Sequence, residues 1–210
     1  MMRSMIKQAG LWLALAGWSV TVWAAMTPEA VISQTADEVV ATLKTDKDIK
    51  NGDRAKAYAL IQNKVLPHFD FLRMTRLAVG KYWRDASAAQ QQQLSDGFRD
   101  LLVRTYSSSL SQYRDQQLKI KGSDMDSGGM EATVHSVMIP SGGPSIPIDY
   151  RMEKMGDDWK VFDIQVDSVS LVTNYRGEFG EIVRSHGVDG LIQALTDKTR
   201  QAENKASKKP

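Results

Sequence analysis

The hydrophobic period of this chain changes twice, and these changes restrict the folds that are open to it. Up to about residue 115, apolar residues recur at the three- and four-residue spacing of amphipathic helices. From Gln116 to Val166 they alternate, and after Asp167 the helical spacing returns. Short turns separate the alternating segments, which predicts an antiparallel meander with one apolar face. Helices segregated from a meander predict an α+β fold, here a curved sheet cupped by helices, an arrangement that can enclose a cavity.

Local signals place the helix boundaries. Thr27-Pro28 predicts a helix start and a helix to about Lys44, while a second helix should end near Pro67. Asp70 is the expected N-cap of a third helix that Gly80 ends. A capping box over 87–90 opens the longest helix, which we expect to run to about residue 113. We expect the polar segment 47–52 to be a break between the first two helices. We expect Gly187 to interrupt the C-terminal helices.

The N-terminus has the pattern of a secretory signal peptide. Arg3 and Lys7 precede the apolar run 9–22, which is too short to span a bilayer comfortably. Small residues at Val22 and Ala24 suit a cleavage site, so we expect residues 1–24 to be removed. No later apolar run approaches membrane length, and the mature protein is therefore expected to be soluble.

Composition excludes several classes of protein. The chain has no Cys, so it has neither disulfides nor thiol chemistry. Without the two cations of the signal peptide, basic and acidic residues balance, and no clustered basic face suggests nucleic-acid binding. The length fits a single domain over 25–197, followed by a basic tail over 198–210 that we expect to be disordered.

No motif indicates catalysis or a metal site. The histidines His68, His135 and His186 lack metal-ligand spacing, and Asp70 near His68 already has a capping role. Asp163 and Asp167 are four residues apart on one strand face, and together with Asp149 they could act as acid and base. We favour the structural alternatives, which are a polar outer sheet face or a helix cap at Asp167 or Ser168. We therefore predict no catalytic residue, no metal and no cofactor.

The positive signal is apolar and lies just past the last strand. Apolar residues over 169–179 form a surface with no charge pair or nucleophile among them. Such a surface is either plain core or the lining of an apolar pocket, and patterning alone is more typical of core. Tyr106 lies on the apolar stripe of the long helix, where a buried hydroxyl needs a partner, so it is expected where the interior meets water.

Three segments carry a family resemblance. They are RLAVGKYWRDAS (76–87), FRDLLVRTYSSSL (98–110), and WKVFDIQVDSVSLVTNYRGEF (159–179) with GVDGLIQAL after it. In this order they resemble the MlaC family, the periplasmic phospholipid-binding proteins of the Mla lipid-asymmetry pathway, also called toluene-tolerance auxiliary proteins. The resemblance covers nearly all of the mature chain.

The resemblance implies an NTF2-like cone whose deep apolar pocket holds the acyl chains of a phospholipid, with the headgroup in solvent. It also implies a monomeric carrier, working between an outer-membrane lipoprotein–porin complex and an inner-membrane ABC transporter with an MCE-domain subunit. We infer the pocket lining from the face of the helix or strand on which each residue lies. The family motif does not assign each residue to the pocket. The candidates are Leu77, Val103, Tyr106, Leu110, Ile148, Tyr150, Phe162, Ile164, Val166, Val169, Leu171, Val172, Tyr175 and Phe179.

Two other hypotheses stay open from the sequence alone. Cones of this kind also house isomerases and dehydratases, for which Asp149 or Asp163 would be the candidate base. A carboxylate pointing into the pocket would support that hypothesis. The other alternative is a protein-interaction module, which a solid core without a cavity would favour.

Overall fold

The computed structural model describes residues 26–110 and 115–207, with side chains described except over 108–110 and 205–207. The predicted signal peptide lies outside these residues. The helices are α1 (Pro28–Thr45), α2 (Lys47–Lys50), α3 (Arg54–Leu60), α4 (Phe71–Val79), α5 (Ala88–Leu110) and α6 (Leu171–Ser207). The strands are β1 (Gln117–Met125), β2 (Glu131–Ile139), β3 (Ile146–Met155), β4 (Asp158–Val166) and β5 (Val169–Ser170).

The helix boundaries confirm most of the capping predictions. Thr27 accepts the Ala30 amide hydrogen bond at the start of α1, and Asp70 accepts that of Arg73 at 2.8 Å. Ser87 and Gln90 form the reciprocal hydrogen bonds of a capping box before α5. The expected polar break at 47–52 is instead the one-turn helix α2, because Asp46 accepts hydrogen bonds from two amides of that turn.

The strands form one antiparallel sheet in the order β1-β2-β3-β4-β5, which confirms the predicted α+β class and the meander. Simple alternation does not hold in β4, however. Arg151 pairs with Asp163 whereas Met152 pairs with Val161, so Phe162 is an extra residue at a bulge. Val161 therefore shares its core with Ile164 on one side of the strand, whereas Phe162 packs into a separate core.

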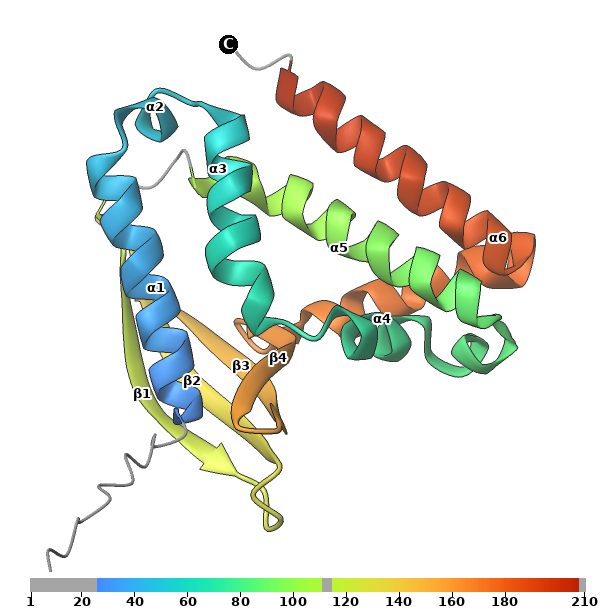
Figure 1. Cartoon of the computed structure of the whole chain (residues 1–210), viewed down its shortest axis with the longest axis horizontal. Helices are drawn as coiled ribbons and strands as arrows, with labels where there is room; N and C mark the ends of the chain where they lie inside the picture. Colours follow the sequence, from blue (N-terminus) through green and yellow to red (C-terminus); the bar gives the residue numbers. More distant parts are fainter. Residues whose placement is uncertain (1–25, 111–114, 208–210) are drawn as a thin grey trace, which may run out of the picture.

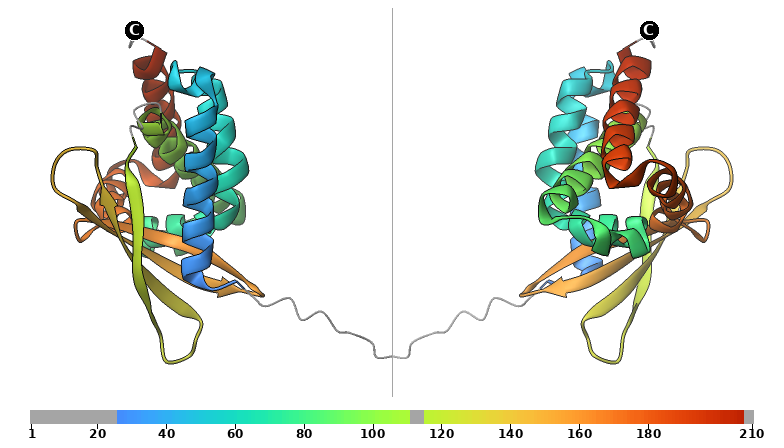
Figure 2. Two further views of the ribbon diagram at one scale, coloured as in Figure 1. Left: turned by 90° about the vertical axis from the view of Figure 1, so that its left-hand side faces the viewer. Right: turned by 90° about the vertical axis from the view of Figure 1, so that its right-hand side faces the viewer.

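The two sides of β4 face different parts of the molecule. One core lies between the sheet and the first turns of α1 and contains Val31, Ile32, Val134, Met152 and Val161. The larger core joins α4, α5 and α6 and includes Phe98, Phe162 and Phe179. Figures 1 and 2 show α1 lying over the strongly curved sheet, while α5 and the C-terminal part of α6 run side by side away from it.

Helix α6 corrects the expectation for the C-terminus. The kink at Gly187 is present, with φ 71° and ψ −176°, but the helix continues to Ser207. Residues 198–207 are thus helical where we expected a disordered tail. Two ion pairs hold this segment: Lys198 contacts Glu178 at 2.6 Å, and Arg104 of α5 contacts Glu203 at 2.7 Å.

Candidate functional site: two adjoining apolar cavities

A cavity of about 450 Å³ lies between the helices and the end of the sheet. We call it the helix-side cavity. Its walls come from the segment after α3, from α4 and α5, and from the chain that leads out of β4 into α6. The lining residues are Ile61, Val65, Leu66, Phe69, Phe71, Met74, Leu102, Val103, Tyr106, Ile164, Val166, Val169, Ser170, Leu171 and Asn174.

A second cavity of about 650 Å³ lies under the middle of α1, against the inner face of the sheet. We call it the sheet-side cavity. Helix α1 is anchored on either side of it, by Val31 and Ile32 in one core and by Leu43 in another. Its lining residues are Ile32, Thr35, Ala36, Val39, Val40, Leu43, Val65, His68, Phe69, Tyr106, Gln116, Gln117, Leu118, Met138, Tyr150, Val161 and Ile164.

The lining of these cavities is almost free of charge. Among the described residues, no Asp, Glu, Lys or Arg lines either one. Burial is the main reason that the pKa of His68 lies below its usual value, and nearby Lys160 lowers it further. Burial raises the pKa of Tyr150 to about 12, against a smaller opposing effect of its hydrogen bond with Ser136. At neutral pH the Tyr150 hydroxyl is therefore neutral, and the site has the chemistry of an apolar ligand pocket.

A hydrogen-bonded cap fixes the rim of the helix-side cavity. The Asp163 side chain is only 2% exposed and accepts hydrogen bonds from the Ser170 hydroxyl at 2.7 Å and the Val172 amide at 3.1 Å. Ser170 in turn accepts the Thr173 amide. These bonds satisfy the first amides of α6 and hold Ser170 and Leu171 at the cavity. The sequence-based prediction is wrong here, since it placed Asp163 on an outer polar face and gave the cap to Asp167 or Ser168.

Those two residues make the turn instead. Asp167 and Ser168 both have positive φ, 50° and 67°, so Val166 of β4 pairs with Val169 of β5 across a tight hairpin. Val166 and Val169 are respectively 45% and 62% exposed although both line the helix-side cavity. This hairpin therefore forms an exposed apolar edge of the cavity.

The predicted lining residues fall into three groups. At the helix-side cavity lie Val103, Tyr106, Ile164, Val166, Val169 and Leu171; Tyr106 and Ile164 also line the sheet-side cavity, together with Tyr150. A second group lines neither cavity and packs in or against the larger core. It consists of Leu77, Phe162, Val172, Tyr175 and Phe179. Ile148 is buried in the sheet and also lines neither cavity. The Leu110 side chain lies outside the described part of the chain.

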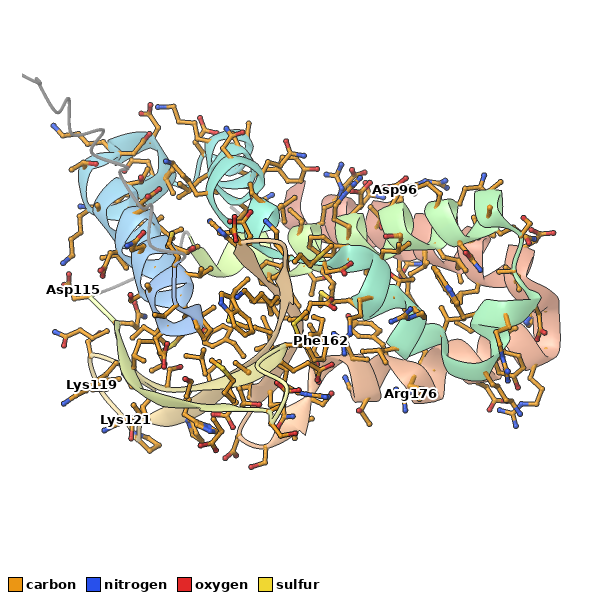
Figure 3. The ribbon with its side chains drawn as sticks, turned by 60° about the horizontal axis from the view of Figure 1, so that its bottom comes forward. Asp96, Asp115, Lys119, Lys121, Phe162 and Arg176 are labelled. Atoms are coloured by element: carbon orange, nitrogen blue, oxygen red, sulfur yellow. The ribbon has the colours of Figure 1, made fainter. Side chains whose placement is uncertain are left out.

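Two aromatic members of the second group, Tyr175 and Phe179, pack together with Phe98 of α5. Phe98 contacts Tyr175 and Phe179 edge to face, with ring centroids 4.9 and 5.1 Å apart. Figure 3 shows Phe162 where the sheet meets the helical half of the molecule. The bulge in β4 explains its position, because it turns Phe162 out of the alternation that the sequence pattern assumed.

Sequence reasoning missed most of the lining residues, and two sets of them show why. One set follows α3, where a π-helical turn over Ile61–Val65 and a 3₁₀ turn over Leu66–His68 present Ile61, Val65 and Leu66 to the cavity. The other lies on α1, where Ala36 and Val39 belong to a helical apolar stripe of the kind that usually forms core. The apolar stripe of α1 was therefore the sequence signal from which Ala36 and Val39 could have been found. A π-helical turn has no comparable sequence signature.

The described residues offer neither a metal site nor a membrane span. Among them, no group of His, Cys, Asp and Glu could hold a metal ion. Within the same part of the chain, no helix is long and apolar enough to cross a bilayer.

Comparisons with known proteins agree with this geometry. The family model described as MlaC protein matches residues 33–197. A toluene tolerance protein, ttg2D, of Pseudomonas putida is 24% identical over 208 residues, covering 98% of this chain and 96% of the relative. An intermembrane phospholipid transport system binding protein, MlaC, of Haemophilus influenzae is 22% identical over 185 residues, covering 86% of each chain.

A solved structure is similar over most of the chain. It is the phospholipid-binding protein from Ralstonia solanacearum in complex with a phospholipid, with a TM-score of 0.79 and 34% identity. The match covers 85% of this chain and 99% of that one. Fold and site thus define an α+β protein with an uncharged, apolar cavity system. The family match then makes the assignment specific: the chain belongs to the MlaC family.

Proposed function

We propose that this protein binds a phospholipid by its acyl chains and carries it across the periplasm between the two membranes. The observation that carries the proposal is the pair of adjoining apolar cavities without a charged lining residue among those described. The Ralstonia relative, which was solved with a phospholipid, supports the same cargo. The predicted signal peptide over 1–24 supports export to the periplasm, and residues 25–197 would form the lipid-binding domain.

Energetics explain why a carrier is needed. Two acyl chains contain roughly 30 methylenes at about 0.8 kcal/mol each, so exposing them to water is prohibitive. An apolar cavity offsets nearly all of that penalty. Because the bilayer is equally apolar, the net transfer energy between bilayer and protein can be small, as reversible exchange requires. An uncharged lining also makes binding insensitive to the headgroup.

The proposed partners are an outer-membrane lipoprotein–porin complex and an inner-membrane ABC transporter with an MCE-domain subunit. The Haemophilus relative is named for an intermembrane transport system, which supports this part of the proposal. A transfer assay with each complex in separate vesicles tests it. Labelled phospholipid should move between the vesicles only when this protein is present, and movement that is equal without it would contradict carriage.

A non-enzymatic role is part of the same proposal. The enzyme hypothesis required a carboxylate directed into the pocket, but Asp149 pairs with His135 at 3.0 Å and Asp163 caps α6. Neither lines a cavity. The hypothesis of a protein-interaction module required a solid core, and the two cavities argue against it.

Lipid content is the direct test of binding. Gently purified protein should release phospholipid on organic extraction and show a lipid-bound mass in native mass spectrometry. Ile164→Glu should reduce this occupancy strongly, because Ile164 lines both cavities and a buried unpaired carboxylate is unfavourable next to acyl chains. A matched control is Val137→Glu, since Val137 is half-buried, pairs with Lys119 and lines neither cavity. Wild-type protein that stays empty would overturn the proposal.

A further inference from the structure

A third cavity, of about 390 Å³, lies where the start of α3, the C-terminal turns of α5 and the last described turns of α6 come together. We call it the polar pocket. Figure 2 shows the beginning of α3 and the end of α6 close to each other at one end of the molecule. None of its lining residues lines the helix-side or the sheet-side cavity, so the polar pocket is a separate site. The lining residues are Arg54, Ala55, Tyr58, Arg104, Ser107, Ala202 and Glu203.

The charges of the polar pocket favour an anion. Two arginines and one glutamate line it, so two positive charges oppose one negative charge. Arg54 comes from α3 and Arg104 from α5, and both are half-buried, so the two charges converge at a site that water screens only in part. The net charge of this lining would be neutralised by one carboxylate, which is also the group that a guanidinium binds with the best geometry.

Contacts on two sides hold the Arg104 guanidinium at the pocket. Its Nη1 lies 2.7 Å from Glu203, and its central carbon lies 5.4 Å from the centroid of the Tyr58 ring. The Nε–H of Arg104 is buried and has no hydrogen-bond partner among the described residues. An unpaired buried donor is unfavourable, and a small shift of the guanidinium toward an anion in the pocket would remove that penalty. Glu203 thus satisfies Arg104 only in part, and the guanidinium can still donate to a ligand.

The remaining lining groups suit the rest of such a ligand. The Tyr58 hydroxyl accepts a hydrogen bond from Gln62 at 3.0 Å, so its own proton is available to a ligand oxygen. The Tyr58 ring, Ala55 and Ala202 add apolar surface. We propose that the polar pocket binds a small organic carboxylate, whose charged group meets the two arginines while a compact apolar body lies against α3 and α6. This site is independent of lipid binding.

Amide chemical shifts test the site directly. Cyclohexanecarboxylate, a monoanion with a compact apolar ring, is titrated into the full purified protein labelled with nitrogen-15, near neutral pH and at low salt. Saturable shifts should appear at the amides of Ala55 and Ala202 and not at Ile164, which lines both lipid cavities. Cyclohexanecarboxamide has the same shape without the charge and should give no saturable shift. Acetate should bind about tenfold more weakly, because it lacks the ring.

Charge variants should change the affinity in opposite directions. Arg54→Gln and Arg104→Gln each remove a cation and should raise the Kd about fivefold. Glu203→Gln keeps an oxygen for Arg104 but removes the competing charge, and it should lower the Kd about threefold.

The matched control is Arg99→Gln. It makes the same charge change on α5, and the Arg99 side chain is 36% exposed against 34% for Arg104, but Arg99 lines none of the three cavities. Its Kd should stay within about twofold of the wild-type value, because solvent and salt screen a charge outside the pocket.

The outcomes decide the assignment. If circular dichroism shows that Arg104→Gln is unfolded, Arg54→Gln and Glu203→Gln still test it. The proposal is overturned if the shifts do not saturate or if they appear at Ile164. It is also overturned if Arg99→Gln weakens binding as much as Arg54→Gln, because binding then follows net charge, or if the carboxamide binds as well as the carboxylate. None of these outcomes depends on the lipid content of the protein, so the test is separate from that of the proposed function.

Discussion

The guanidinium carbon of Arg73 lies 3.6 Å from the centroid of the Phe162 ring. The same guanidinium donates to Glu153 at 2.6 Å and forms an ion pair with Glu131. Its side chain is 16% exposed, so these contacts are partly shielded from water. Since Arg73 is on α4 and the other three residues are on strands, this cluster fastens α4 to the sheet beside the helix-side cavity.

We expect Arg73→Met to lower the free energy of unfolding by about 2 kcal/mol, because it leaves two carboxylates without their cation and removes the stacked charge. Urea denaturation measures the loss. Lys81→Met is the control, since the Lys81 ammonium lies 5.1 Å from the centroid of the Tyr82 ring but Lys81 is exposed, and its effect should stay below about 1 kcal/mol. Equal losses in the two variants would contradict a special role for Arg73.

The Asp163 cap gives a second prediction. Asp163→Ala should destabilise the protein by about 2 kcal/mol, because the Val172 amide and the Ser170 hydroxyl lose their buried acceptor. Asp163→Asn keeps one carbonyl acceptor and should cost less. Hydrogen exchange should show the Val172 and Thr173 amides opening first in the alanine variant. Unchanged exchange at these amides would mean that the cap does not hold the start of α6.

Two glycines of α6 should respond in opposite directions. Gly187 has φ 71° and ψ −176°, a conformation that is open almost only to glycine, so Gly187→Ala should cost about 2 kcal/mol. Gly177 is exposed, has ordinary helical geometry and has open space around an added Cβ. Gly177→Ala should therefore stabilise the protein by about 0.5–1 kcal/mol. Thermal midpoints of the two variants test the sign of each change.

The fold was predictable because its signals are local. Caps at Thr27, Asp70 and Ser87 and the alternating strands depend on a few neighbouring residues, and the structure confirms them. The continuation of α6 to Ser207 was missed for the opposite reason. It is held by ion pairs to Glu178 and Arg104, and residues so far away in sequence give no local signal.

The cavity lining was predictable only in part. Residues such as Ile164 and Val169 follow from strand position, and they do line a cavity. Phe162 does not follow, because it is the extra residue at the bulge in β4 and leaves the alternating pattern. Asp163 keeps the side of the strand opposite Ile164, but the start of α6 covers it, and no local pattern in the sequence indicates that contact. The π-helical turn after α3 likewise depends on tertiary packing, so the sequence could not place Val65 in the cavity lining.

His135 predicts a pH dependence of stability. Hydrogen bonds to Asp149, and secondly to Asp124, raise its pKa above the ordinary value of 6.5. A raised folded-state pKa stabilises the protein fully below the unfolded value and loses this contribution as pH rises through the folded value. Wild-type stability relative to His135→Gln should therefore fall between about pH 6 and pH 8, by less than about 1 kcal/mol because the His135 side chain is 39% exposed and water screens its pairs.

Urea midpoints at the two pH values measure this difference. Asp149→Asn removes the first partner of His135 and should weaken the pH dependence, as should high salt. If the difference between the wild type and His135→Gln were constant across this range, the His135 pair would contribute nothing to stability.

The exposed edge at Val169 predicts an effect on the rate of lipid exchange. Val169 is 62% exposed and lines the helix-side cavity, so an acyl chain that enters there must pass it. Val169→Glu should leave the thermal midpoint unchanged, because the carboxylate stays in water in the folded protein. It should slow uptake of fluorescent phospholipid from vesicles by about tenfold, since passage of the acyl chain strips water from the Glu carboxylate.

Met155→Glu is the control, because Met155 is 50% exposed and lines neither cavity, and it should exchange lipid at the wild-type rate. Equal rates in the two variants would place the entry route elsewhere, most directly beside α1.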